Sequence, residues 1–547
     1  MCRFVLLLAA ALELPFPASA QLPSIKLHGI VNAASFFAAG LPGGSIARGS
    51  IFTIFGGALG PAQGTQVSSF PLGNTLSGVS ITVTQAGNVV NALPLFVRQD
   101  QINAVMPSNA PLGWVSVQVT YNNARSNPAP AYVVNDSAGI FTSIGTGLGP
   151  GAIHNFVTAA SQPANSTANS AKPGQVVTLF ATGLGPITSP DNQAPPAGTL
   201  PTPVEVWVGG VPASVSYSGR SPCCSGLDQV IFTVPSAAPQ GCWVPVEIRT
   251  SHATVSNFVS MAVDPKGAPC SDPSNPFSRA IVNGGSFGLL TLLRMAVHED
   301  LGVNSAIDVT EDFVTMTATN QPGGAFAFAP FAGTPPPGSC TVYPGSGDFF
   351  EGGNVPQVAP PALDPGKQFQ VSGPGSSQSV TLQYSAAPLG SYLPLYSLPN
   401  LLFLAPGKYA VSSTGGADVG PFNASVTVPS PLTWTNRDQT TVVSRSQSLT
   451  LEWSAGAANQ PVTILGIDSD LPTNSSALFI CTAPVGATSF TVPPEVLAAI
   501  PATQPSLLHS KSVIYVISAN DSTFAASGLN AAHADAVFMS GKTVSFE

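Results

Sequence analysis

The sequence is that of a long, weakly charged chain rich in apolar residues, glycine and proline. It has 547 residues, of which 44% are hydrophobic and only 8% charged, with 53 glycines and 54 prolines. Disordered chains combine low hydrophobicity with high charge, so this composition favours folded domains, about three to five of them at this length. The net charge is −9 with only 17 Lys and Arg residues, which argues against nucleic-acid binding because that needs a basic surface.

The first 20 residues have the pattern of a secretory signal peptide. Arg3 precedes a short apolar run at residues 4–12, and Ala18–Ala20 matches a small-residue cleavage site. No later stretch reaches the roughly 18 uninterrupted apolar residues of a membrane helix. We therefore expect cleavage after Ala20 and a secreted or cell-surface protein without a membrane span.

An internal repeat organises the first half of the chain. The tract GSIFTIFGGALGP at residues 49–61 matches GQVVTLFATGLGP at residues 174–186, with an offset of 125. The tract DQINAVMPSNAPLGWVSVQV at residues 100–119 matches DQVIFTVPSAAPQGCWVPVEI at residues 228–248, where the offset is 128. An almost constant offset indicates two copies of one module.

Each copy has the pattern of an immunoglobulin-like β-sandwich. Residues 115–119 and 244–248 alternate apolar and polar side chains, as half-buried strands do. Residues 204–208, with three alternating valines, predict a strand whose valines face a core. Proline and glycine interrupt the chain about every 8 to 12 residues, the spacing of sandwich turns. We expect an all-β fold of tandem immunoglobulin-like sandwiches with very little helix: module 1 at residues 21–140 and the cysteine-bearing module 2 at residues 141–263.

These tracts also resemble a known group of sequences. NAASF, GSIFTIFGGALGP, PLGNTLSGVSITV and QINAVMP, in this order, resemble an uncharacterised repeat-domain family that is abundant in secreted proteins of acidobacteria. That family is related in style to IPT/TIG immunoglobulin-like modules. The resemblance covers roughly residues 28–265. It implies the fold and export, and it supplies no catalytic residues.

The second half of the chain predicts two more β-rich domains. Residues 264–430 contain several strand candidates and one short helix, for which the apolar run Leu289–Glu299 is the candidate. Residues 431–547 contain further strand candidates at turn-punctuated spacing, which indicates a C-terminal immunoglobulin-like or fibronectin-like sandwich. Trp453 is expected in its core.

Six cysteines remain after the signal peptide, and an even number in an exported protein predicts three disulfides. These disulfide candidates are Cys223, Cys224, Cys242, Cys270, Cys340 and Cys481. The first four cluster, so we expect two bridges among them, and Cys224 with Cys242 would close a short loop. Cys340 and Cys481 are then left to pair. The cluster lacks the C-x-x-C spacing and the nearby histidines of a zinc site.

The stretch IVNGGSFG at residues 281–288 raises the question of a serine hydrolase, because Ser286 lies in a G-x-S-x-G pattern. Such an elbow needs a parallel α/β sheet, followed in the chain by an acid and a histidine. Asp468 and His509 have the right order, but predicted helices are almost absent. IVNAASFF at residues 30–37 repeats the phrase without the glycines. We expect no enzyme; an extracellular serine hydrolase that uses Ser286 is the alternative.

No pattern predicts a cofactor or a metal. The histidines are dispersed, and His298 in HEDLG lacks the second histidine of a zinc motif. The acidic clusters at residues 308–312 and 468–470 do not match a calcium-binding EF-hand loop.

The predicted role is therefore binding, adhesion or scaffolding outside the cell, since sandwich arrays present loops and edges to partners. An extracellular polysaccharide or protein is the expected partner. No aromatic platform is evident, because Trp114, Trp207 and Trp243 all lie within strand patterns and are expected to pack in a core or on a sheet surface. A purely structural spacer is the remaining alternative.

Overall fold

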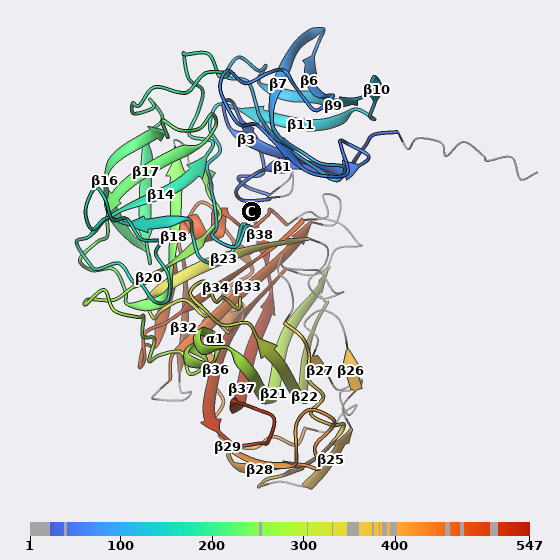
Figure 1. Cartoon of the computed structure of the whole chain (residues 1–547). Helices are drawn as coiled ribbons and strands as arrows, with labels where there is room; N and C mark the ends of the chain where they lie inside the picture. Colours follow the sequence, from blue (N-terminus) through green and yellow to red (C-terminus); the bar gives the residue numbers. More distant parts are fainter. Residues whose placement is uncertain are drawn as a thin grey trace, which may run out of the picture.

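The fold is built almost entirely from strands, as the composition and the alternating patterns predicted. Figure 1 shows three regions: module 1 in blue to cyan, module 2 in teal to green, and the C-terminal half (residues 264–547) in yellow-green to red. Among the described residues the helices are α1 (Ser278–Asn283), α2 (Pro494–Ala498) and the 3-10 turn η2 (Arg437–Gln439). The predicted signal peptide lies outside the described residues. The computed structural model describes residues 22–37, 41–250, 254–302, 305–330, 332–346, 360–374, 377–381, 383–385, 391–393, 402–454, 460–470, 475–503 and 512–547.

Module 1 is a sandwich whose two layers share one strand. Strand β7 pairs with β6 through residues 88–92 and with β8 through residues 93–97, so it passes from one layer to the other. Alternate side chains of the strands, such as Phe52 and Val117, fill the core between the layers. The strands are β1 (Ser24–Asn32), β2 (Ile46–Ala47), β3 (Ile51–Gly57), β4 (Thr65–Gln66), β5 (Thr75–Leu76), β6 (Val79–Gln85), β7 (Asn88–Val97), β8 (Gln101–Val105), β9 (Gly113–Tyr121), β10 (Ala124–Arg125) and β11 (Ala129–Val134).

Module 2 repeats this design. Strand β16 pairs with β15 through residues 211–213 and with β17 through residues 214–220. Val206 and Val208 are buried in the core and Val204 packs against it, as their alternation predicted. The strands are β12 (Gly139–Ile140), β13 (Ile153–Asn155), β14 (Val176–Thr182), β15 (Val204–Val208), β16 (Val211–Arg220), β17 (Asp228–Thr233), β18 (Gly241–Thr250), β19 (Thr254–Val255) and β20 (Val259–Val263). Strand β12 lies just before the expected start of module 2 at residue 141, but it pairs with β14 and is therefore counted with module 2.

Equivalent hydrogen bonds occur at the same positions in the two copies. In module 1 the Asn127 amide accepts a bond from the Ile25 N–H (2.8 Å) and donates one to the Ile25 carbonyl (3.1 Å). In module 2 Asn257 does the same for Ile140, at 2.7 and 2.9 Å. These matching bonds fix the correspondence of residues between the modules.

The C-terminal half is organised around one nine-stranded sheet with the order β23-β34-β33-β36-β37-β21-β22-β27-β26. Strands from both sides of residue 430 pair directly in this sheet, β23 with β34 and β21 with β37, so one sheet extends across the expected boundary at residue 430. A four-stranded sheet, β25-β24-β28-β29, shares a core with the end that contains β21 and β22. The strands β30, β32 and β35 and helix α2 cover the other end, in a core that includes Trp434 and, as expected, Trp453.

The bounds of the strands in this half are β21 (Gly285–Gly302), β22 (Ser305–Gln321), β23 (Ser339–Ser346), β24 (Gln368–Ser372), β25 (Ser377–Thr381), β26 (Gln383–Ser385), β27 (Ser391–Leu393), β28 (Gly407–Ser413), β29 (Phe422–Val428), β30 (Thr433–Trp434), β31 (Val442–Val443), β32 (Leu449–Ser454), β33 (Val462–Asp470), β34 (Ser475–Thr482), β35 (Ser489–Val492), β36 (Val513–Thr523), β37 (Ala531–Thr543) and β38 (Ser545–Phe546).

The expected helix at Leu289–Glu299 is wrong. These residues lie in the long strand β21, which pairs antiparallel with β22 and parallel with β37. Leu290 and Leu292 are buried on one face of the sheet, while Leu289 and Leu293 are half-buried on the other. Apolar residues therefore occur on both faces, and the apolar–polar alternation of a strand is lost. The helix in this region is α1, which ends where Gly284 adopts a left-handed φ of 71°.

Buried contacts join the three regions. Arg220 of module 2 forms an ion pair with Asp228, and both side chains are almost fully buried. Its guanidinium also donates to the carbonyls of Gly49 (2.6 Å) in module 1 and Gly185 (2.7 Å). Phe37 of module 1 and Phe258 of module 2 belong to one apolar cluster with the C-terminal half. The modules therefore hold a fixed arrangement.

Candidate functional site

The most exposed aromatic side chains that lie together are on the outer surface of module 1. Val115 and Val117 of β9 point into the core, so Trp114 points outward. Tyr132 of β11 lies directly opposite it across the strand pair. The two ring centroids are 5.2 Å apart and the planes are inclined by 67°. Trp114 is 62% exposed and Tyr132 43% exposed, which is unusual for large aromatic residues with no partner.

A groove of about 530 Å³ runs beside these rings. Its far wall is a bulge in β1, where residues 26–29 leave the register between Ile25 and Ile30. His28 in this bulge has a left-handed φ of 54°, a strained conformation that needs support from the surrounding structure. We call the groove, together with Lys26, Leu27, His28, Trp114 and Tyr132, the Trp114 face.

The Trp114 face is held by hydrogen bonds to its backbone. The Gln85 amide donates to the carbonyls of Leu112 (2.7 Å) and Trp114 (2.9 Å). The Asn127 side chain hydrogen-bonds both backbone groups of Ile25, at the base of the bulge. Gly29 closes the bulge so tightly that a Cβ there would meet the Phe55 carbonyl at 2.6 Å. The face is preformed, which lowers the ordering cost of binding.

In module 2 the corresponding groove is filled by the chain itself. Ile25 and Ile30 flank four residues in module 1, while their counterparts Ile140 and Ile153, which pair with the equivalent positions of β14, flank residues 141–152. This longer loop folds back along β20. Its residues Gly149 and Gly151 exchange two hydrogen bonds of 2.8 Å with Ser260.

The counterpart of Ser260 in module 1 is Pro130, since Pro130 pairs with Ser116 as Ser260 pairs with Pro245. Proline has no N–H to donate, so Pro130 cannot form the equivalent of the bond that the Ser260 N–H donates to the Gly149 carbonyl. The module 1 strand is thereby left beside an open groove.

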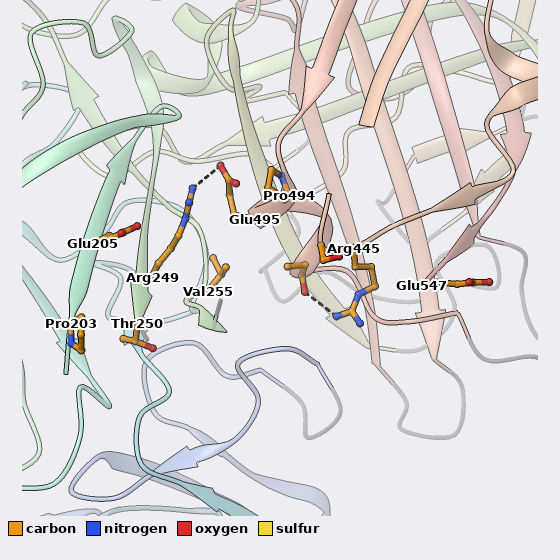
Figure 2. A pocket seen from close by; sticks show the side chains of 11 residues that line it. Pro203, Glu205, Arg249, Thr250, Val255, Arg445, Pro494, Glu495 and Glu547 are labelled. Atoms are coloured by element: carbon orange, nitrogen blue, oxygen red, sulfur yellow. Dashed lines mark hydrogen bonds and ion pairs between the residues drawn. The ribbon is translucent and has the colours of Figure 1, made fainter. Parts of the chain in front are cut away.

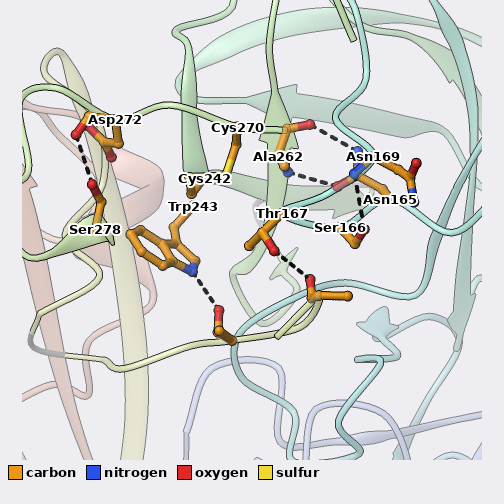
Figure 3. Close-up of a disulfide and its surroundings, with 12 residues drawn as sticks. Asn165, Ser166, Thr167, Asn169, Cys242, Trp243, Ala262, Cys270, Asp272 and Ser278 are labelled. Carbon is orange, nitrogen blue, oxygen red and sulfur yellow. Dashed lines mark hydrogen bonds between the residues drawn. A yellow bond between two sulfur atoms is a disulfide. The ribbon is translucent and has the colours of Figure 1, made fainter. Parts of the chain in front are cut away.

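The counterpart of Trp114 is Trp243, which is only 2% exposed. Its indole N–H donates to the carbonyl of Ala327 at 3.0 Å. Figure 3 shows the Cys242–Cys270 disulfide beside the ring. Residues from the start of the C-terminal half, among them Ile281, pack over the ring. Module 2 therefore uses this face to hold the rest of the chain.

The disulfides differ in part from the expected pairing. The structure pairs Cys223 with Cys224 and Cys242 with Cys270, so the favoured Cys224–Cys242 pairing is wrong. Cys242 lies in a bulge of β18 and packs with Trp243 against residues beyond module 2, where Cys270 is located. Cys340 and Cys481, the remaining two, are directly opposite each other on β23 and β34 and are bonded.

Ser286 lies on β21 and its hydroxyl is bound to Asn530. The hydroxyl donates to the Asn530 side-chain oxygen (2.8 Å) and accepts from the Asn530 N–H (3.0 Å). His533 pairs with Leu289, so its side chain is on the opposite face of the sheet from that of Ser286. The structure does not bring these two groups together.

The other residues singled out for chemistry lie elsewhere. Asp468 is buried and accepts hydrogen bonds from Thr503 (3.1 Å) and Ser512 (2.6 Å), and His509 lies outside the described residues. His298 contacts Asp308 at 3.0 Å on the exposed end of the sheet. Within the described residues, no group of three His, Cys, Asp or Glu side chains is placed to hold a metal ion.

A second cleft, of about 730 Å³, lies between module 2 and helix α2. Figure 2 shows Arg249 directed at Glu495 (2.6 Å), with Glu205 and Glu547 also lining the cleft. Arg445 donates to the carbonyl of Ala498 (3.0 Å). The Arg249 guanidinium also stacks on Trp207 at 3.9 Å. Next to it, burial raises the pKa of Glu247 to about 8, and the charge of Arg249 opposes the rise. The two arginines hold the junction together, so the positive charges of the cleft already have protein partners.

Sequence reasoning missed the Trp114 face, although a signal was present. The alternation of residues 115–119 predicts that Val115, Val117 and Val119 face the core, and the same alternation places Trp114 on the outer face of the strand. In the same way, Tyr132 lies on the outer face because its neighbours Ala131 and Val133 face the core.

In the part of the chain that the structure describes, no helix has the length and apolar character required to cross a membrane.

Comparisons with known proteins give distant structural similarity only. No protein-family profile matches the chain, and no curated protein matches it. A structure of the plexin A4 extracellular region aligns with 86% of this chain at 11% identity and a TM-score of 0.16. The chain covers only 17% and 30% of the two plexin A4 structures it matches.

Two further solved structures are similar over most of their length. SGBP-B from a complex xyloglucan utilization locus in Bacteroides uniformis aligns with 70% of this chain and 88% of its own, at 14% identity and a TM-score of 0.17. The I9–I11 tandem from titin aligns with 70% of this chain and 94% of its own, at 7% identity and a TM-score of 0.12. The strands and sheets of the chain themselves show a multi-domain β protein with immunoglobulin-like modules.

Proposed function

We propose that this protein is a non-enzymatic, extracellular polysaccharide-binding protein that contacts its ligand through the Trp114 face of module 1. The disulfides and the signal-peptide pattern support a location outside the reducing cytoplasm. Module 2 and the C-terminal half then act as the rigid support of this binding module.

One observation carries the proposal: an exposed tryptophan and an exposed tyrosine form the wall of a preformed groove. Aromatic side chains with an apolar ring and a polar edge are typical of binding surfaces. The apolar C–H face of a sugar ring packs on such a ring, while the tyrosine hydroxyl and nearby amides hydrogen-bond the sugar hydroxyls. The same position in module 2 is buried, so exposure is a feature of module 1 and not of the fold.

The proposal is tested with the purified mature chain on a panel of polysaccharides, by affinity electrophoresis and calorimetry. We expect binding to at least one polysaccharide and a loss of about tenfold or more on Trp114→Ala, since an aromatic anchor of a binding surface contributes about 2 kcal/mol. Phe156→Ala is the matched control, because Phe156 is an exposed aromatic residue of module 2 and should leave binding unchanged.

Two results would contradict the proposal: no binding to any member of the panel, or binding that Trp114→Ala does not weaken. Hydrolysis of a generic ester that is abolished by Ser286→Ala would instead favour the hydrolase alternative.

A further inference from the structure

We infer that the Trp114 face selects an acidic polysaccharide and binds a single uronic-acid unit, with its ring against Trp114 and Tyr132 and its carboxylate at Lys26. This inference rests on the proposed function and adds the class of ligand.

The first support is the shape of the aromatic pair. The planes of Trp114 and Tyr132 are inclined by 67° with centroids only 5.2 Å apart. The two rings therefore form a corner, in which part of one ring is covered by the other. A flat ribbon of sugar rings needs aromatic side chains that lie in one plane. A corner fits one ring of a chain end, a branch or a twisted chain.

The second support is the charge of the groove. Although the chain carries a net charge of −9, none of the described residues that line this groove is a carboxylate. Its ionisable groups are Lys26 and His28, which both lie in the bulge of β1. A positive group on a negatively charged protein produces a local attraction for anions.

The third support is that Lys26 is available. Among the described residues no ion pair involves Lys26. Asp100 is near enough for the charge of Lys26 to lower its pKa, but the larger cause is its bond to Arg98, at 2.5 Å. Asp100 therefore already has a partner, and the Lys26 ammonium remains free for a ligand carboxylate.

The bulge itself indicates that these side chains are placed for a purpose. Bulges direct side chains out of the regular alternation and are frequent at binding sites. Here the bulge makes Lys26, Leu27 and His28 all exposed in succession. The left-handed conformation of His28 is a cost that an ordinary continuous strand would avoid.

The test compares two forms of one polymer that differ only in charge: polygalacturonate and its methyl ester, with alginate as a second acidic polymer. We expect the mature chain to bind an acidic polymer about five- to tenfold more tightly than the ester, as one charge-assisted contact provides. Lys26→Gln should reduce the affinity for the acid to that for the ester and leave the ester unaffected. Added salt should weaken only the charged contribution.

Lys266→Gln is the control, since Lys266 is an exposed lysine just beyond the last strand of module 2. Equal affinity for acid and ester, or an acid affinity that Lys26→Gln leaves unchanged, would overturn the inference. If neutral polysaccharides still bind and Trp114→Ala still abolishes that binding, the proposed function stands without it. If no polymer binds at all, both fail.

Discussion

Modules 1 and 2 are two copies of one sandwich that use the same face in opposite ways. Trp114 is 62% exposed beside an open groove, whereas its counterpart Trp243 is 2% exposed beneath the start of the C-terminal half. The difference arises from three local changes: four residues instead of twelve between the matching isoleucines, Pro130 instead of Ser260, and no cysteine before Trp114.

This comparison shows how a repeated module acquires two roles. The face is suited to contact an apolar or aromatic partner in both copies. In module 2 the partner is covalently attached, since Cys242–Cys270 fixes the following segment over Trp243. In module 1 the described residues leave the face open, and under the proposed function its partner is an external polysaccharide. The following predictions test this division of roles, starting with the largest expected effect.

The first prediction contrasts Asp228 with its counterpart Asp100. Asp228→Ala should destabilise the protein by about 3–5 kcal/mol, because it leaves the buried Arg220 guanidinium without its counter-charge. Asp100→Ala should leave stability nearly unchanged, since the pair with Arg98 is exposed to solvent. Urea unfolding followed by tryptophan fluorescence measures both. Equal effects of the two substitutions would show that the junction between the modules is not built as described.

The second prediction concerns the stability contribution of the two tryptophans. Trp243→Ala should cost about 3 kcal/mol, through the cavity left beside the disulfide. Trp114→Ala should change stability by no more than about 0.5 kcal/mol, because the ring is at the surface. The same unfolding measurement decides this. A strong destabilisation by Trp114→Ala would mean that Trp114 is a packing residue, as the sequence alone suggested.

The third prediction uses pH. Burial raises the pKa of Glu247 in the folded state to about 8 from an ordinary value of 4.5, so the folded protein binds the proton more tightly. Its contribution to stability is complete below about pH 4.5 and is lost as the pH rises to about 8, by up to roughly 1.4 kcal/mol per pH unit. Glu247→Gln, which introduces the residue found at the equivalent position 118 of module 1, should remove this part of the slope.

The measurement is the free energy of unfolding of both proteins between pH 4 and pH 9. Glu495 is the second carboxylate at this junction and remains in the variant, paired with Arg249. An unchanged slope in Glu247→Gln would therefore assign the pH dependence to other groups.

The sequence was sufficient to predict the strands, the repeat and the fold class, because alternation and turn residues are local signals. It failed for β21, because apolar residues lie on both faces of this strand and no apolar–polar alternation remains. It also could not show that Trp243 is buried, since the covering carbonyl of Ala327 is 84 residues away. The bond between Cys242 and Cys270 depends on the same distant packing.

The candidate site could be predicted from the sequence only in part. The outward direction of Trp114 followed from its position next to an inward series of valines. Its exposure did not, because exposure depends on what the rest of the chain leaves uncovered. Ser286 shows the opposite case. The G-x-S-x-G motif is present in the sequence, but the structure places the Ser286 hydroxyl against Asn530 and the His533 side chain on the other face of the sheet.

The most direct test of the account observes the two counterpart tryptophans at once. In a protein labelled with ¹⁵N-tryptophan, the indole N–H resonances of Trp114 and Trp243 are assigned with Trp114→Phe and Trp243→Phe and followed during a titration with oligogalacturonate. The account predicts that the Trp114 resonance shifts on binding and that the Trp243 resonance stays in place. A ligand that binds but leaves the Trp114 resonance unmoved would contradict it.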